Sequence, residues 1–441
     1  MKISVFGTGY LGATHAVCMA ELGHTVIGVD VDATKIERLA AGDAPFYEPG
    51  LPSLLRTHVA SGRLRFTTDY SEAANFADLH FIGVGTPQRE PDFAADTTFV
   101  EQVVRDLAPL LPRNAIIVGK STVPVGTAAK LQELANTGVA RGLQAEVVWN
   151  PEFLREGFAI NDTLDPDRIV IGVANANSEG EQVLRRAYAP ILERERACPV
   201  VVTDLETAEL VKVSANAFLA TKISFINAVS EVCEAAGADV TVLADAIGLD
   251  DRIGRKFLGA GLGFGGGCLP KDIRAFMARA GELGADQALT FLREVDSINM
   301  RRREKMVELT SRACGGTVLG KTIAVLGASF KPNSDDVRDS PALNVAGMLS
   351  LKGANTIVYD PKALANARRS FPTLNYAESA LEACAGADAV LVATEWREFV
   401  QLDPETVGAV ARGRVLLDGR NCMPSDRWCN LGWSYYALGR G

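Results

Sequence analysis

Apolar residues in the N-terminal part of the chain come in short runs that alternate with helical patterns. The runs are KISVFGTG, HTVIGVD, ADLHFIGVGTP, NAIIVGKSTVP and AEVVWNPEF, and a helical segment through Met19 follows the first of them. Short apolar strands that alternate with helices are typical of a parallel sheet covered by helices on both faces. We therefore predict an α/β domain in this part of the chain.

The same pattern returns near the C-terminus, where KTIAVLGASF, NTIVYDP, ADAVLVATEW and GRVLLDGRN predict a second sheet. HTVIGVD resembles NTIVYDP, and ADLHFIGVGTP resembles ADAVLVATEW. These pairs suggest two similar α/β units in one chain. Convergence on a common building unit would give the same pairs, so duplication is a suggestion only.

A helical connector is predicted between the two sheets. Thr203 and Glu206 fit a capping box, and a helical pattern then runs to about Ala236. Between Pro199 and Pro332 the sequence contains one proline, Pro270. We expect three domains: an N-terminal domain at 1–200, a helical dimerisation domain at 201–300 and a C-terminal domain at 301–441.

Composition narrows the class of protein. A chain of 441 residues is too long for one core, and its net charge of −9 argues against a general nucleic-acid or membrane-surface binder. The eight cysteines form no CxxC pair or metal-like spacing, which favours reduced thiols in the cytoplasm. The sequence opens directly on a strand, which leaves no room for a signal peptide. All four histidines precede residue 81, which excludes His-dependent chemistry elsewhere, and we expect no metal.

A dinucleotide site is predicted in the first fifty residues. Gly7, Gly9 and Gly12 form a GxGxxG turn, here GTGYLG, between a strand and a helix. Asp30 ends the next strand, where its carboxylate can bind both ribose hydroxyls. An acid at this place repels a 2′-phosphate, so NAD is preferred over NADP. Lys35 is a candidate near the adenosine, or else a solvated helix charge.

Polar residues at later strand ends are candidates for the same site. Thr86, Ser121 and Thr122 follow apolar strands, and ligands of open parallel sheets bind beyond these ends. Glu152 and Glu156 in NPEFLREG would share a face if they lie on a helical turn. Alone, each of these residues is more often an ordinary turn residue.

Two further segments carry reactive side chains. Lys212 and Asn216 lie one turn apart on the predicted long helix among apolar neighbours, and together they could stabilise an oxyanion. In GFGGGCLPKD, Cys268 is a candidate nucleophile, with Asp272 as a base and Lys271 as a charge for the cofactor. Thiolate attack on an aldehyde gives a thiohemiacetal. Hydride loss to NAD gives a thioester, and water then releases an acid.

These motifs together resemble one family. GTGYLG, GTP, STVPVGT, NPEFLREG, VKVSANAFLA, GFGGGCLPKD and FKPNSDDVRDSP occur in the order found in the nucleotide-sugar dehydrogenases, the UDP-glucose/GDP-mannose dehydrogenase family. The resemblance spans essentially the whole chain. It implies two Rossmann-like parallel-sheet domains joined by a long central helix and a helical dimerisation region. It also implies two NAD-dependent oxidations of a sugar primary alcohol to a carboxylate, with UDP-glucose the expected sugar nucleotide and UDP-glucuronate the product.

The resemblance assigns roles residue by residue. Cys268 would be the nucleophile, Lys212 and Asn216 would polarise the reacting oxygen, and Asp272 would assist proton transfer. Thr122 and Glu152 would hold the water. The cofactor contacts it implies are Gly7, Gly9, Tyr10, Leu11, Gly12, Asp30, Lys35, Thr86, Ser121, Thr122, Glu156, Lys271 and Arg338. The substrate contacts are Glu152, Phe153, Leu154, Arg155, Lys212, Asn216, Arg252, Phe257, Leu258, Gly259, Ala260, Gly261, Gly265 and Lys331.

In this reading the glycines beside Cys268 make room for the nucleotide sugar, and Arg252 is supplied across a homodimer interface. Relatives often have serine at the position of Gly267 and phenylalanine at that of Leu269, and neither difference removes a proposed catalytic atom. GDP-mannose or a UDP-N-acetylhexosamine is an alternative substrate. A two-electron hydroxy-acid dehydrogenase would not need Cys268 or the second α/β domain. A non-catalytic NAD-sensing protein would not need Cys268, Lys212, Asn216 and Asp272 together.

Overall fold

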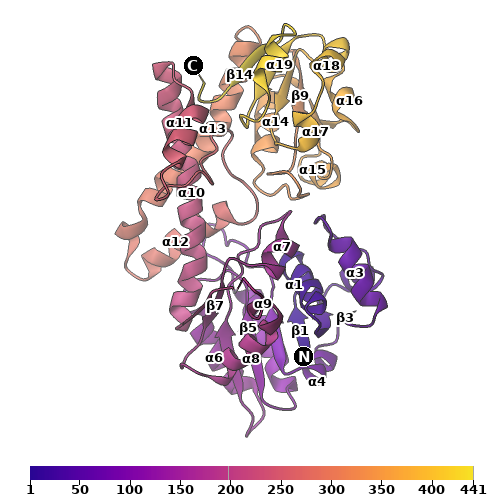
Figure 1. Ribbon diagram of the computed structural model, residues 1–441, viewed down its shortest axis with the longest axis vertical. Coiled ribbons are helices and arrows are strands. Elements are labelled where there is room, and N and C mark those ends of the chain that lie inside the picture. The colour runs from indigo at the N-terminus through magenta and orange to yellow at the C-terminus, as the bar shows by residue number, and fades with distance from the viewer. Residues whose placement is uncertain (197, 441) are drawn as a thin grey trace. The chain divides into compact units, whose positions relative to one another are not determined.

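A computed structural model describes residues 1–196 and 198–440 (Figure 1). The chain divides into two compact units. The first comprises Met1–Ala215 and Arg274–Gly284, and the second Asn216–Ile273 and Ala285–Gly441. Each unit contains one sheet, as the two sets of apolar runs predict. No helix within the described residues has a long enough apolar stretch to cross a membrane.

The sheet of the first unit has the strand order β3-β2-β1-β4-β5-β6-β7-β8. Its strands are β1 (Lys2–Phe6), β2 (Thr25–Val29), β3 (Leu64–Thr67), β4 (Leu79–Ile82), β5 (Ala115–Gly119), β6 (Ala145–Trp149), β7 (Ile169–Gly172) and β8 (Val200–Thr203). The first six pair in parallel, but β6 and β7 are antiparallel through Trp149 and Gly172. The strands predicted from the sequence, β1, β2, β4, β5 and β6, all pair in parallel, whereas the antiparallel strand β7 was not predicted.

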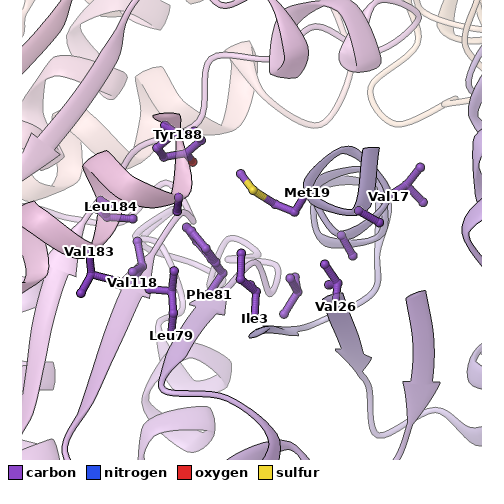
Figure 2. Packing of buried hydrophobic residues seen from close by; sticks show 14 of the residues in the cluster. Ile3, Val17, Met19, Val26, Leu79, Phe81, Val118, Val183, Leu184 and Tyr188 are labelled. Carbon is purple, nitrogen blue, oxygen red and sulfur yellow. The ribbon is translucent and has the colours of Figure 1, made fainter. Parts of the chain in front are cut away.

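Helices cover both faces of this sheet, as the two-residue alternation along its strands requires. One face buries Ile3 and Phe81 against α1 (Tyr10–Glu21), α3 (Leu51–Ala60) and α8 (Glu179–Ala187). Figure 2 shows this cluster, in which Ile3, Leu79, Phe81 and Val118 of neighbouring strands lie near Met19 of α1 and Leu184 of α8. The other face packs against α4 (Tyr70–Phe76), α5 (Thr98–Leu107) and α6 (Thr127–Gly138). The remaining helices of this unit are α2 (Ala33–Ala40), the 3₁₀ turn η1 (Ala108–Leu110), α7 (Ala159–Leu164) and α9 (Ala189–Leu192).

The long helix predicted between the sheets is α10 (Leu205–Ala236). Its cap differs from the prediction. Thr203 is the last residue of β8, so Asp204 is the residue that precedes the first helical turn. The Asp204 carboxylate accepts hydrogen bonds from the Thr207 amide at 2.6 Å and from the Thr207 hydroxyl at 2.9 Å. Asp204 therefore caps α10. The other helices of this region are α11 (Val240–Gly248), α12 (Leu269–Glu282), η2 (Asp286–Leu289) and α13 (Phe291–Ala313).

The sheet of the second unit has the order β11-β10-β9-β12-β13-β14, and neighbouring strands are parallel. Its strands are β9 (Thr322–Leu326), β10 (Asn355–Tyr359), β11 (Asn375–Tyr376), β12 (Ala389–Val392), β13 (Val415–Asp418) and β14 (Ser434–Ala437). Its helices are α14 (Pro341–Leu351), α15 (Leu364–Ser370), α16 (Ala380–Cys384), α17 (Arg397–Val400), α18 (Pro404–Val410) and α19 (Ser425–Cys429). The order repeats that of β3-β2-β1-β4-β5-β6, which confirms two similar α/β units.

Candidate active site

The turn between β1 and α1 uses its three glycines in different ways. A Cβ on Gly12 would lie 1.7 Å from the Gly7 carbonyl oxygen, so only glycine lets α1 begin this close to the strand. Gly7 has φ +85°, and a Cβ there would lie 2.6 Å from the Val84 side chain. Gly9, in contrast, has no atom of another described residue, its two chain neighbours apart, within 4 Å of its Cβ position. The turn therefore leaves open space beside the first residues of a helix, which is where a pyrophosphate binds.

Asp30 lies at the carboxyl end of β2, beside this turn. Its Oδ2 accepts hydrogen bonds from the Thr8 amide at 2.7 Å and from the Lys35 ammonium at 2.9 Å. Burial alone would raise the pKa of Asp30, but Lys35 and the Thr8 amide outweigh it and hold that pKa below its usual value. The side chain is thus a fixed carboxylate next to the glycine turn. Lys35 lies at its side, as an adenosine-edge residue would.

The second sheet has a similar carboxylate in a different setting. Asp360 accepts hydrogen bonds from the Ala328 and Ser329 amides and from the Trp396 indole, so its oxygens are engaged by the protein itself. The loop between β9 and α14 spans residues 327–340, whereas residues 7–9 join β1 to α1. The second sheet therefore lacks the tight turn that brings a helix start to a phosphate. The first sheet carries the dinucleotide site.

Hydroxyl groups join the loops after β4 and β5. Thr86 donates to the Thr122 carbonyl at 2.8 Å, and Ser121 donates to the Val84 carbonyl at 2.7 Å. These two loops lie beyond neighbouring strands at the carboxyl edge of the sheet, as the sequence analysis expected. The start of α6, just after Thr122, is held by Glu209 of α10, whose carboxylate accepts the Gly126 and Ala128 amides.

The NPEFLREG segment after β6 is a loop, and the expected helical turn is absent from it. Glu152 Oε1 accepts hydrogen bonds from the Phe153 amide at 2.8 Å and the Leu154 amide at 3.1 Å, which is a turn that the side chain itself stabilises. Glu152 and Glu156 therefore do not share a helical face. Glu156 is buried, and Arg155 forms an ion pair with Asp162 at 2.6 Å.

Aromatic and tyrosine contacts further order this loop. The ring of Phe153 lies under two cations, with the Arg168 guanidinium 3.9 Å and the Lys212 ammonium 5.5 Å from its centroid. Tyr10 accepts a hydrogen bond from the Gly157 amide at 3.0 Å, and its hydroxyl donates to Glu48. Tyr10 belongs to the glycine turn's helix, so the dinucleotide turn and the NPEFLREG loop are directly connected.

Catalytic candidates of the second unit meet at the start of α12. The Asn216 amide donates to Asp272 Oδ2 at 2.6 Å, and the Lys271 ammonium lies 2.7 Å from Asp272 Oδ1. Cys268 is exposed and immediately precedes α12. The positive end of a helix favours a thiolate at this position. On α10, Lys212 lies one turn before Asn216, as predicted.

The glycines around Cys268 permit close packing within the protein, which the sequence analysis did not predict. A Cβ on Gly265 would lie 2.3 Å from the Asp339 carbonyl oxygen, and one on Gly267 would lie 2.3 Å from the Arg338 guanidinium carbon. Gly263 and Gly266 are similarly close to Asn299 and the Phe330 ring. These glycines therefore allow the protein's own chain to approach closely, and the room for a nucleotide sugar that the resemblance implies stays a prediction.

The expected substrate stretch 257–261 combines strain, burial and open space. Phe257 has φ +66°, an unfavourable backbone conformation for a bulky residue that is often found at functional sites. Leu258 and Ala260 are buried, whereas no atom lies within 4 Å of a Cβ on Gly259. The Gly261 amide donates to Asn227 at 2.9 Å, which holds the end of the stretch.

Charged candidates of the second unit lie at its surface or in its loops. Arg252 is 89% exposed and pairs with Asp250 at 2.6 Å. Arg338 pairs with Asp336 at 2.7 Å. The Lys331 ammonium lies 5.3 Å from the centroid of the Phe330 ring.

Several buried or half-buried residues that organise these loops were missed in the sequence analysis. Lys120 pairs with Glu152, and Glu48 accepts the Gly157 and Ala159 amides. Arg420 donates to the carbonyls of Gly263 and Ala393, and Arg303 to Asp339. Residues 301–303 are three consecutive arginines, a pattern typical of an exposed basic face, yet Arg302 and Arg303 are fully buried. Charged side chains are seldom fully buried, so an expectation from the sequence would place both arginines at the surface.

A glycine turn that opens a helix, with an acid at the end of the next strand, defines a dinucleotide-binding α/β protein. Family models match along the chain: the UDP-glucose/GDP-mannose dehydrogenase family NAD binding domain at residues 1–192, central domain at 206–301 and UDP binding domain at 324–425. The chain therefore belongs to the UDP-glucose/GDP-mannose dehydrogenase family. Its NAD cofactor and nucleotide-sugar class of substrate follow from these domains. The boundaries predicted at residues 200 and 300 stay a prediction.

Individual relatives extend this match. The chain is 42% identical to a UDP-glucose 6-dehydrogenase of Rhizobium meliloti over 100% of both chains. Among solved structures, it is similar to a UDP-glucose dehydrogenase of Pyrobaculum islandicum, with a TM-score of 0.90 and 38% identity over 100% of this chain and 97% of that one. A UDP-D-ManNAc dehydrogenase of Pyrococcus horikoshii has a TM-score of 0.86 and 26% identity over 100% of both chains.

The two carboxylates Asp30 and Asp360 allow a matched test of the NAD site. We expect Asp30→Asn to raise the Kd for NAD about tenfold or more, because a hydrogen bond to a charged group is lost at the ribose. Asp360→Asn removes the corresponding carboxylate of the other sheet and should lower stability without changing that Kd. Calorimetric titration of both variants with NAD measures the difference. An unchanged Kd in Asp30→Asn would mean that the carboxylate only supports the turn.

Proposed function

We propose that this chain oxidises the C6 primary alcohol of UDP-glucose to the carboxylate of UDP-glucuronate in two NAD-dependent steps. The observation that carries the proposal is the group formed by Cys268, Asn216, Lys271 and Asp272 in a chain that has the family's NAD and UDP binding domains. A single oxidation of an alcohol needs no thiol. An exposed cysteine at a helix start supplies what a second oxidation needs, which is covalent capture of the aldehyde.

The residues of the first sheet fit NAD. The open space at Gly9 suits the pyrophosphate, Asp30 suits the ribose, and Thr86, Ser121, Thr122 and Glu156 lie on loops at the same edge of the sheet. Tyr10 and Leu11 begin α1 directly after the glycine turn, and Lys35 lies on α2 beside Asp30. Lys271 and Arg338 are proposed as further cofactor contacts. Bound NAD would accept a hydride from the sugar carbon in each oxidation.

The protein's own groups would manage the proton, the aldehyde and the water. Lys212 and Asn216 polarise the reacting oxygen and stabilise the oxyanion that forms on it. The Cys268 thiolate attacks the aldehyde to give a thiohemiacetal, and loss of the second hydride leaves a thioester. Asp272 assists with proton transfer, and Thr122 and Glu152 hold the water that releases the acid and the thiol. Capture on sulfur keeps the aldehyde bound between the two oxidations.

Substrate recognition is proposed to involve the strained stretch at Phe257 and the NPEFLREG loop. The stretch Phe257–Gly261, with Gly265, would surround the nucleotide sugar, and Lys331 would neutralise part of its diphosphate. The NPEFLREG residues Phe153, Leu154 and Arg155 would contact the sugar side. These cations matter because the whole chain carries a charge of −9 and gives an anionic ligand no general attraction.

UDP-glucose is favoured over other sugars by the relatives. The proteins named for UDP-glucose are 42% and 38% identical to this chain, and the one named for UDP-D-ManNAc is 26% identical. A two-electron hydroxy-acid dehydrogenase would leave the UDP binding domain and Cys268 without a use, and a non-catalytic NAD sensor would leave the Asn216–Asp272 pair without one.

The chain is proposed to act as a homodimer in the cytoplasm. On α10, Phe218, Phe225 and Val232 are spaced by seven residues and therefore lie on one face, where each side chain is more than half exposed. Leu249, after α11, is 85% exposed. A second copy would cover this apolar face, and Arg252 beside Leu249 could then reach the partner's active site.

The stoichiometry of the reaction tests the proposed function. With NAD in excess, we expect two NADH per UDP-glucose consumed, because the alcohol must lose two hydrides to become an acid. An end-point absorbance titration measures the ratio. One NADH per sugar would mean that the reaction stops at the aldehyde. No NADH from a folded, NAD-binding sample would point to another nucleotide sugar or to the sensor.

Replacing the thiol tests the covalent step. We expect Cys268→Ser to lose steady-state acid formation by about a thousandfold or more and to accumulate a covalent or aldehyde-level species, because a serine is a poorer nucleophile and a poorer leaving group. Intact-mass spectrometry and product analysis would detect it. Acid formation at the native rate by this variant would remove the thioester mechanism.

Mixed dimers test the sharing of Arg252. Arg252→Ala and Cys268→Ala are each expected to be inactive alone. Dimers re-formed from an equal mixture should regain about a quarter of wild-type activity, because half of them are heterodimers with one complete site. Phe225→Asp, which places a charge in the proposed interface, should yield monomers by light scattering. Heterodimers without activity would show that Arg252 acts within its own subunit, and active Arg252→Ala homodimers would show that it has no role.

A further inference from the structure

A lysine with no assigned role lies buried behind the NPEFLREG loop. Lys120 directly follows β5, and its side chain is 4% exposed. Its ammonium lies 3.0 Å from the Glu152 carboxylate, 3.0 Å from Asn150 Oδ1 and 3.5 Å from the Tyr188 hydroxyl. A buried ammonium is costly to desolvate unless it is paired and hydrogen-bonded. Its place at the strand end is thus determined by these partners.

Glu152 is held from two sides. Backbone amides of its own loop bind Oε1, and Lys120 binds Oε2. These contacts fix the direction of the carboxylate, and 15% of the side chain remains exposed, so one edge is still accessible. Asn150 Oδ1, which Lys120 also contacts, accepts from Tyr188 at 2.7 Å, and the Asn150 amide donates to the Val170 carbonyl at 2.8 Å. The cation therefore stands in a rigid frame.

We propose that Lys120 is a positioning residue that aims the Glu152 carboxylate at the water that releases the product. This inference rests on the proposed function, because that proposal gives Glu152 the water. Lys120 and Thr122 come from one strand end and Glu152 from the next, β5 and β6 being parallel neighbours. One short segment would thus supply both a partner of the water, Thr122, and the cation that orients the other partner.

The other titratable groups around the pair do not compete for this role. Burial, and then the charge of Lys120, lowers the pKa of His15 on α1. Burial, and then the charge of Glu152, raises the pKa of Cys18, also on α1. Burial raises the pKa of Tyr188 despite the opposing effect of Lys120. These three groups are therefore neutral near pH 7. Burial would lower the pKa of Lys120 itself, but Glu152 and Tyr188 outweigh it and the pKa is raised, so the lysine stays charged.

The pH profile of the reaction separates a positioning role from a merely structural one. We expect Lys120→Met to lower kcat about a hundredfold, because the carboxylate is no longer aimed. The acid limb of the kcat profile should also move to higher pH, because removing a cation 3.0 Å from a carboxylate disfavours its ionised form. Tyr188→Phe is the matched control: it loosens the same frame but retains the ion pair, so its acid limb should stay in place. A wild-type rate and profile for Lys120→Met would overturn the proposal.

A double variant tests whether Lys120 acts through Glu152. In a Glu152→Gln background, adding Lys120→Met should change kcat less than about threefold, because the group that Lys120 positions is already gone. The same loss in both backgrounds would show that Lys120 acts elsewhere and would overturn the proposal. If Lys120→Met alone fails to fold, the comparison of Glu152→Gln with the double variant still tests the proposal, because neither variant has a carboxylate at position 152.

Failure of this inference is distinguishable from failure of the proposed function. If the wild type forms two NADH per UDP-glucose and the variants behave additively, only the role of Lys120 is wrong. If the wild type forms none, the proposed function fails and the pair is tested without turnover, by urea unfolding of the wild type, both single variants and the double variant at several pH values. Coupled midpoints that depend on pH would support the charged pair, and additive, pH-independent midpoints would overturn it.

Discussion

The loops at the carboxyl ends of the strands depend on buried carboxylates that accept hydrogen bonds from backbone amides. Such loops leave amides without partners, and a buried amide without a partner is destabilising. Asp30 serves the turn after β1, Glu48 the loop before α7, Glu209 the start of α6 and Asp360 the loop after β9. Each replaces water with a carboxyl oxygen that accepts the amide hydrogen, so the loops are held in one conformation without a ligand.

The two sheets have similar topologies but differ in the loop that follows the first strand of each. They share a strand order, and each has an aspartate at the end of its second strand in chain order, β2 or β10. In the first sheet a three-glycine turn starts the helix at once. In the second, the long loop of residues 327–340 precedes the helix, and Trp396 donates to the aspartate. The loop length and the Trp396 indole therefore distinguish the two units. The first has a dinucleotide site, and the second has loops that carry Lys331 and Arg338.

The polar residues of an active site must be held in fixed positions by their neighbours as well as carry the right charge. Cys268 sits on a stretch whose glycines bring the chain against Asn299, Phe330, Arg338 and Asp339, so its backbone has little freedom. Glu152 is fixed by its own loop and by Lys120. Reacting atoms placed by rigid neighbours lose less entropy on the way to the transition state than mobile ones do. The buried arginines 302 and 303 and the half-buried Arg420 are among these rigid neighbours.

The sequence by itself determined the alternation of strands and helices, the glycine turn with Asp30, the long helix to Ala236 and the chemical identities of Cys268, Lys212, Asn216 and Asp272. These are local or periodic features, which a single strand or helix is enough to express. Tertiary structure alone decided the antiparallel β6–β7 pair, Asp204 as the cap of α10, the loop conformation around Glu152 and the pairing of Lys120. Each of these depends on which distant segment arrives beside a residue, and a buried charge in particular is stable only when its partner is brought to it by the fold.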